Sequence, residues 1–211
     1  MGGRSNLLHL PPGVRRGGWA RHKPPRPAWG LAACAGRLTE GSASFDAPLS
    51  AAIVPLLEAQ ASAQPCAWVG GLGRDPYPPD LQAVGVDLAR LVSVRVPPGK
   101  QGRATDLLAR SGAFAVIVVD LGGYDLPMPL QTRLLGLAQR HNAALIFLTK
   151  KEPEKASLSS LISLRLEFQL TPTGHLSGCC IKDKTGPAQW RVDEPLAPLP
   201  GCEHYRAERQ R

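Results

Sequence analysis

Several features that mark common classes of protein are missing from this sequence. No stretch of its 211 residues approaches the roughly 20 consecutive apolar residues that cross a bilayer, so we expect no membrane span. Its five cysteines are scattered and form neither a C-x-x-C pair nor the spacing of a zinc site. Cysteines in that pattern favour a reducing cytoplasm, and they predict neither a metal nor another cofactor.

Acidic residues are absent from the first 39 positions, which hold seven basic residues. Residues 40–211 then contain 18 basic and 17 acidic residues, so nearly all of the net charge of +8 arises in the N-terminal segment. A basic surface over the whole fold is therefore not expected. Only the N-terminal segment has the uncompensated charge for phosphate contacts, through Arg15, Arg16, Arg21, Lys23 and Arg26.

Residues 1–35 are rich in proline and glycine and show neither a helical nor a strand period. Both residue types break regular structure, so we predict an irregular basic arm with a docked piece around Trp29. One function for this arm is weak, sequence-independent DNA binding that falls steeply with salt. The alternative is a solvated tail without a ligand. The prolines argue against an organellar transit peptide, which needs an amphipathic helix.

From residue 36 to residue 195 the pattern changes to alternating strands and helices, and a C-terminal tail follows at 196–211. The strongest element is 113–120, AFAVIVVD, which is apolar on both faces and predicts a strand covered by helices on both sides. We therefore predict an α/β domain with a mainly parallel sheet. Further strands are expected at 66–69, 91–96 and 143–149, and helices near 48–57 with a kink at Pro55, 81–83, 103–110 and 130–138.

The C-terminal part of this domain alternates strictly between apolar and polar residues over 162–170. That period of two is typical of a sheet with one buried face and one wet face. Short strands at 178–182 and 188–192 follow, and together these segments predict an antiparallel extension of the sheet.

A parallel α/β sheet binds ligands at the carboxyl ends of its strands, and we expect the first strand-to-helix loop to begin at Gly41. The pattern that cradles phosphates there is G-x-x-x-x-G-K-[ST]. Set on Gly41, the chain has Asp46, Ala47 and Pro48 in place of the glycine, the lysine and the hydroxyl. The cation and the metal-binding hydroxyl are both lost, so the sequence predicts a degenerate phosphate loop.

Asp120, which closes the strongest strand, has the position of a magnesium-binding acid in nucleotidases. A hydrophobic strand ending in aspartate is common, however, and the alternative is that Asp120 caps the following turn. The histidines lie in dissimilar segments and the serines lack a G-x-S-x-G context, so neither residue type indicates a catalytic site.

Four pieces of the chain form an ordered series: GRLTEG at 36–41, DP at 75–76 followed by GVDL at 85–88, RSGA at 110–113 leading into AVIVVD, and SLRLE at 163–167 followed by IKDK at 181–184. At compatible spacings this series resembles the core of the RecA recombinase over residues 36–195. The chain is most similar to the RecA-like proteins called ImuA, which are encoded with bacterial mutagenesis cassettes and are related to the cell-division inhibitor SulA. The resemblance implies a RecA-like core.

Three departures from RecA bear on activity. The glutamate that activates the attacking water after the second strand is missing, since residues 68–73 read WVGGLG. The two DNA-binding loops are short, with only 121–129 and 150–157 in their places. The polymerisation helix has no counterpart in the proline-rich arm. We therefore expect neither ATP hydrolysis nor another enzymatic activity.

The resemblance implies a catalytically inactive interaction protein of the bacterial DNA-damage response and translesion mutagenesis, with RecA and a translesion-polymerase-like protein as partners. In RecA filaments, a Lys-x-Lys pair at the place of Lys182 and Lys184 reaches the ATP of the neighbouring protomer. That similarity implies that these lysines bind RecA and cap its filament; two solvated lysines at a strand tip are the alternative. The sequence is also compatible with a SulA-like division inhibitor, with a weak ATP-binding protein or hydrolase, and with a DNA-binding module that uses the arm.

Overall fold

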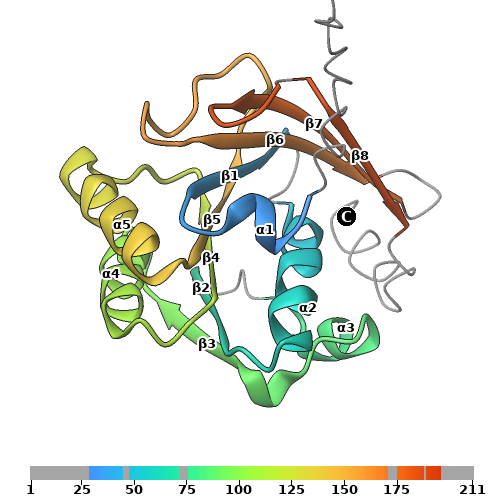
Figure 1. The fold of residues 1–211 in the computed structure, drawn as a ribbon, viewed down its shortest axis with the longest axis vertical. Helices are drawn as coiled ribbons and strands as arrows, with labels where there is room; N and C mark the ends of the chain where they lie inside the picture. Colours follow the sequence, from blue (N-terminus) through green and yellow to red (C-terminus); the bar gives the residue numbers. More distant parts are fainter. Residues whose placement is uncertain (1–28, 45–47, 72–75, 171–174, 188, 196–211) are drawn as a thin grey trace, which may run out of the picture.

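The computed structural model describes residues 29–44, 48–71, 76–170, 175–187 and 189–195, and the predicted arm over 1–28 and tail over 196–211 lie outside these ranges. No helix within the ranges is both long enough and apolar enough to cross a membrane. Figure 1 shows the elements, which are α1 (Leu31–Cys34), β1 (Leu38–Ala43), a 3-10 turn (Leu49–Ala52), α2 (Ile53–Ala61), β2 (Cys66–Gly71), α3 (Pro78–Ala83), a second 3-10 turn (Leu88–Arg90), β3 (Leu91–Val96), α4 (Gln101–Ser111), β4 (Val116–Gly122), α5 (Met128–His141), β5 (Ala144–Lys150), β6 (Leu164–Leu170), β7 (His175–Asp183) and β8 (Arg191–Pro195).

One sheet of eight strands forms the centre of the fold, in the order β3-β2-β4-β5-β1-β6-β7-β8. Every neighbouring pair from β3 to β6 is parallel. β7 pairs antiparallel with β6, and β8 pairs antiparallel with β7. The predicted α/β class, with a mainly parallel sheet and an antiparallel C-terminal extension, is therefore confirmed.

Helices cover both faces of the parallel part of the sheet (Figure 1). α1 and α2 contact one face, where Trp68, Val118 and Ile146 are fully buried. α4 and α5 contact the other, where Ile117 and Phe147 are fully buried. Because β4 and β5 carry an apolar layer on each face, their sequences are nearly continuous hydrophobic runs, as predicted.

The core begins before residue 36. Trp29 is 2% exposed, its ring lies edge-on to Phe168 with centroids 5.1 Å apart, and its indole N–H donates to the carbonyl of Ala51 at 2.7 Å. Cys34 in α1 is fully buried in the same cluster. The docked piece expected around Trp29 is present. Because Trp29 and Cys34 belong to the core, the predicted boundary between arm and core at residue 36 lies too far toward the C-terminus.

Helix ends follow the preferences of single residues. Pro55 lies in the first turn of α2, where a missing N–H costs no helical hydrogen bond, so it marks the start of the α-helix and not the kink that we predicted. α4 ends at Gly112 with φ of 65°, and α5 ends at Asn142 with φ of 51°. Glycine and asparagine are the residues that adopt this left-handed conformation most readily.

Candidate functional site

The carboxyl ends of β1 and β5 form the candidate site, because β1 continues to α2 on one face of the sheet while β5 continues to a segment on the other. β1 extends to Ala43, so the expected start of its loop at Gly41 is wrong. A Cβ on Gly41 would lie 3.4 Å from the side chains of Leu148 and Phe168, which is ordinary van der Waals contact, so Gly41 lies among packed side chains and not in an open loop. Pro48 directly precedes the first 3-10 turn, and Asp46 and Ala47 lie outside the described residues.

Asp120 lies one strand further along, inside β4 and not at its end. A β-bulge between Asp120 and Gly122 lets the strand continue for two more residues. The carboxylate is 1% exposed and accepts a hydrogen bond from the backbone N–H of Gly122 at 2.9 Å. This contact is typical of an aspartate that caps a turn, which was the alternative to magnesium binding.

A hollow of about 420 Å³ opens beside the ends of β1 and β5. Ser44, Lys150, Lys151, Glu152 and Lys155 line it. The three lysines outnumber Glu152, the one carboxylate in this lining, so a hollow at the carboxyl ends of parallel strands favours an anion. They supply neither a nucleophile paired with a base nor the backbone cradle of a phosphate loop.

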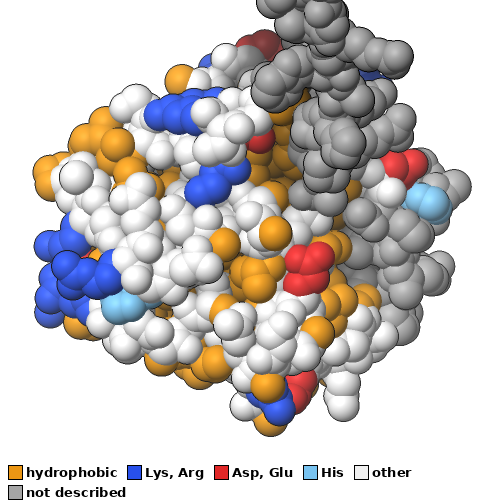
Figure 2. Space-filling model, in the orientation of Figure 1, with side chains coloured by type: hydrophobic (Ala, Val, Ile, Leu, Met, Phe, Trp, Pro, Cys, Tyr) orange, Lys and Arg blue, Asp and Glu red, His pale blue; other side chains and the backbone are white. Residues whose placement is uncertain are grey.

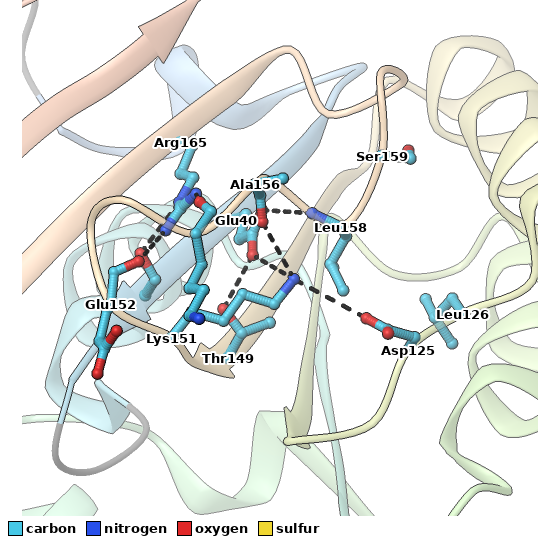
Figure 3. A network of polar contacts seen from close by, with 12 residues as sticks. Glu40, Asp125, Leu126, Thr149, Lys151, Glu152, Ala156, Leu158, Ser159 and Arg165 are labelled. Atoms are coloured by element: carbon cyan, nitrogen blue, oxygen red, sulfur yellow. Dashed lines mark hydrogen bonds and ion pairs between the residues drawn. The ribbon is translucent and has the colours of Figure 1, made fainter.

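Glu40 lies in a network of polar contacts that includes Lys151, one of the residues lining this hollow (Figure 3). Its side chain is fully buried, and Oε1 accepts from Thr149 Oγ1 at 3.0 Å while Oε2 accepts from the backbone N–H of Leu158 at 2.9 Å. The Nζ of Lys151 lies 3.5 Å from Oε1 and 3.8 Å from a carboxylate oxygen of Asp125. Glu40 is therefore occupied by three donors and acts as an anchor for the segment after β5.

Arg165 anchors the same segment from β6, where it lies opposite Glu40 in the parallel register. Its guanidinium is 1% exposed and donates to the carbonyls of Lys155 and Glu152, the latter at 3.0 Å, and to Ser42 Oγ at 3.2 Å. Glu40 and Arg165 together form a clamp that holds the connection between β5 and β6 across one face of the sheet.

Glu167 extends this buried polar row along β6. Its two carboxylate oxygens accept from Ser42 Oγ at 3.0 Å and from Ser44 Oγ at 3.3 Å. Burial raises the pKa of Glu167, and the two serine hydrogen bonds and the charge of Arg165 only partly oppose that rise. The polar face of β6, expected to be wet, is buried at Arg165 and Glu167, because the segment after β5 covers it.

The sequence pattern missed this clamp for a definable reason. Alternation along β6 correctly separates its two faces, but it does not show what lies over each face. The signal present in the sequence was a pair of charges, Arg165 between the leucines of β6 and Glu40 in β1. Charged side chains inside neighbouring parallel strands need partners, so their presence predicts a covering polar segment.

Lys182 and Lys184 lie near the end of β7, on the strand next to β6. Lys182 pairs in register with Arg165 of β6, which itself pairs with Glu40 inside β1. The Nζ atoms of the two lysines donate to the carbonyls of Ser159 and Ser160. Burial, together with the charges of Lys184 and Arg165, lowers the pKa of Lys182. The two cations are thus held side by side at some electrostatic cost.

Asp183, between the two lysines, forms an ion pair with Arg37 at 2.7 Å, and both side chains are largely buried. Burial alone would raise the pKa of Asp183, but hydrogen bonds from Thr185 and Arg37 outweigh burial and lower the pKa below 3.8. We expect Asp183→Asn to reduce the free energy of unfolding by about 1–3 kcal/mol at pH 7.

The loss of stability in Asp183→Asn depends on pH, because folding lowers the pKa of the Asp183 carboxyl. A lowered carboxyl pKa stabilises the folded state above the unfolded value, and the stabilisation disappears as the pH falls through the folded pKa. Urea unfolding of wild type and Asp183→Asn is therefore expected to differ at pH 7 and to converge below pH 3.8. Asp193→Asn, at a side chain that is 76% exposed, is the control. A difference independent of pH would contradict this account.

The sequence also singled out the basic residues of the arm and the pair of neighbouring cysteines. The five basic residues of the arm lie outside the described ranges. Cys179 is exposed and Cys180 is buried, as expected for neighbours on one strand. Within the described part of the chain, no three His, Cys, Asp or Glu side chains are grouped to hold a metal ion. The chain matches no known protein family, and no curated protein is significantly similar to it.

Proposed function

We propose that this protein is a catalytically inactive, RecA-like interaction protein that binds RecA and limits filament growth in bacterial DNA-damage tolerance. The observation that carries the proposal is the separation of two surfaces. Lys182 lies level with Glu40 of β1, and the degenerate phosphate loop follows the end of β1 at Ala43, about 10 Å further along the strand.

Opposite placement is what a head-to-tail contact requires. A protomer that donates lysines from one edge and receives a partner at the other propagates a filament, whereas a protomer with only the donating edge ends it. Here the receiving edge has Pro48 where a magnesium-binding hydroxyl belongs, and Lys151 at that edge is engaged by Glu40. The protein therefore joins a filament end and prevents further addition.

The electrostatics of the lysine pair support a binding role. Burial and the neighbouring charge of Lys184 lower the pKa of Lys182, and the charge of Glu40 only partly opposes them, so the folded state disfavours the charge of Lys182. A phosphate from a partner protomer relieves that repulsion on binding. Substituting Lys182 by glutamine removes the crowding, so the free protein is expected to be as stable as wild type or slightly more stable.

The test is RecA filament assembly on single-stranded DNA, with filament length measured by electron microscopy. Substoichiometric wild-type protein is expected to shorten filaments, and Lys182→Ala/Lys184→Ala to lose about ten-fold or more in potency, since charge-assisted contacts to phosphate contribute on the order of 2–5 kcal/mol together. Lys150→Ala/Lys155→Ala is the matched control at the other edge. Equal inhibition by the double variant, or none by wild type, refutes the proposal.

One observation favours a second function, weak binding of nucleotide phosphates. The hollow lined by Lys150, Lys151 and Lys155 presents cations where an α/β sheet binds anions. A fluorescent ATP analogue separates the two functions. Micromolar binding that is lost in Lys150→Ala/Lys155→Ala supports a nucleotide site, whereas the interaction protein proposed above is expected to bind the analogue no better than weakly and not to hydrolyse ATP.

A further inference from the structure

Four arginines lie on the outer helix layer, away from the lysine pair and the hollow. Arg103 and Arg110 belong to α4, and Arg133 and Arg140 belong to α5. Seven residues separate the two arginines of each helix, which is two turns, or about 10.5 Å. Each pair therefore lies on one side of its helix. Figure 2 shows Lys and Arg side chains gathered over α4 and α5 beside a histidine.

A buried aspartate joins the two pairs. Asp106 of α4 has a side chain that is only 8% exposed; it accepts from Arg133 Nε of α5 at 2.6 Å and from Arg110 of its own helix at 2.9 Å. One arginine from each helix is thereby fixed where α4 and α5 meet. Both guanidiniums remain about half exposed. Their outer N–H groups are still directed to solvent or to a partner.

The charge of this surface is only partly compensated. Asp106 is the only acidic residue in either helix, and neither Arg103 nor Arg140 pairs with a carboxylate among the described residues. Residues 40–211 as a whole are nearly neutral. Basic and acidic residues are mixed along the chain, but in the folded protein these four arginines lie together on one face.

An apolar strip lies among the four arginines. Both helices carry the spacing Arg-x-x-x-Leu-x-x-Arg, which places Leu107 and Leu137 between the arginines of their helices. Leu107 is 62% exposed, and Leu137 is half-buried. Next to Leu137, a Cβ on Gly136 would meet nothing within 4 Å, so the surface of α5 is open there. An apolar centre inside a rim of arginines is the composition of a protein interface.

We propose that the α4–α5 surface, defined by Arg103, Arg110, Arg133, Arg140 and Leu107, binds an acidic amphipathic helix of a partner protein. Carboxylates seven residues apart on such a helix match the spacing of about 10.5 Å within each arginine pair. A leucine or aromatic residue between them covers Leu107 and fills the space above Gly136. A nucleic acid backbone satisfies the arginines but leaves the leucine exposed, so the geometry favours protein. This site does not depend on Lys182 or Lys184.

The experiment uses the full-length protein and a displayed library of helical peptides with randomised surface positions. Enriched peptides are expected to carry Asp or Glu seven residues apart with an apolar residue between them. Affinity of a selected peptide, measured by fluorescence anisotropy, is expected to fall about ten-fold or more in Arg103→Ala/Arg140→Ala and several-fold in Leu107→Ser. Arg191→Ala, at an exposed arginine of β8, is the matched control and is expected to bind normally.

Two results overturn the proposal. Selected peptides without acidic enrichment, or with affinity unchanged in Arg103→Ala/Arg140→Ala, show that the α4–α5 surface is a solvated face. Binding of a DNA duplex through the same arginines, with no effect of Leu107→Ser, assigns the α4–α5 surface to nucleic acid. The filament assay distinguishes this site from the lysine pair, since Arg103→Ala/Arg140→Ala is expected to limit RecA filaments as well as wild type does.

Discussion

Replacing Glu40 with alanine is expected to lower the free energy of unfolding by about 3–5 kcal/mol. The carboxylate is fully buried and satisfies Thr149, the Nζ of Lys151 and the backbone N–H of Leu158. Its removal leaves a partly buried cation without its closest partner and a backbone donor without an acceptor. Each such loss costs more than the original contact contributes, because water does not replace the missing oxygens.

Two measurements check this prediction. Urea unfolding gives the stability difference, with Glu154→Ala as a control at an exposed glutamate of the same segment that is expected to change stability by no more than about 0.5 kcal/mol. Trypsin reports the clamp itself. Cleavage after Lys151 and Lys155 is expected to be faster in Glu40→Ala than in wild type under native conditions. Unchanged stability and unchanged cleavage together would show that the segment is held by other contacts.

Arg165 provides an internal comparison for the same clamp. Glu40 holds the backbone N–H of Leu158, and Arg165 holds the carbonyls of Glu152 and Lys155, so the two residues grip different parts of one connection. Removing either releases the segment, so removing both is expected to cost less than the sum of the single losses.

The parallel sheet was predictable because its central strands are continuous runs of apolar residues along the chain. Residues 116–120 and 143–149 are buried from both sides, and the continuous hydrophobic sequence of each predicts this burial. Their ends were less predictable. The predicted strand 113–120 begins only at Val116. β4 continues past Asp120 because of a bulge, which depends on the register with β5 and not on the identity of the aspartate.

The candidate site was only partly predictable, because its contacts join residues far apart in the chain. Glu40 and Leu158 are 118 positions apart, and Arg37 and Asp183 are 146 positions apart. Net charge was equally uninformative about the arginine face, since counting along the chain averages α4 and α5 with acidic residues that lie elsewhere. Both failures have one cause: side chains meet through topology, which local patterns do not contain.

Replacing Trp29 with alanine is expected to cost about 3–5 kcal/mol, the usual loss for a large aromatic side chain removed from a core. The indole contacts Phe168 edge-on and donates to Ala51, so it ties the chain before α1 both to β6 and to the turn before α2. Trp29→Phe keeps most of the ring volume and loses the hydrogen bond, and it is expected to cost about 1–3 kcal/mol. Tyr77→Ala, at a side chain that is 63% exposed, is the control.

The burial of Trp29 decides how the N-terminal arm is to be tested. A chain that begins at residue 36 lacks Trp29 and Cys34, which are buried in the core, so it is expected to unfold at lower urea concentration than wild type. Loss of DNA binding in that truncation would report unfolding as well as loss of charge. Substituting Arg15, Arg16 and Arg21 with serine in the full chain removes charge without removing the core. If the arm binds DNA, that variant is expected to lose affinity and salt sensitivity at unchanged stability.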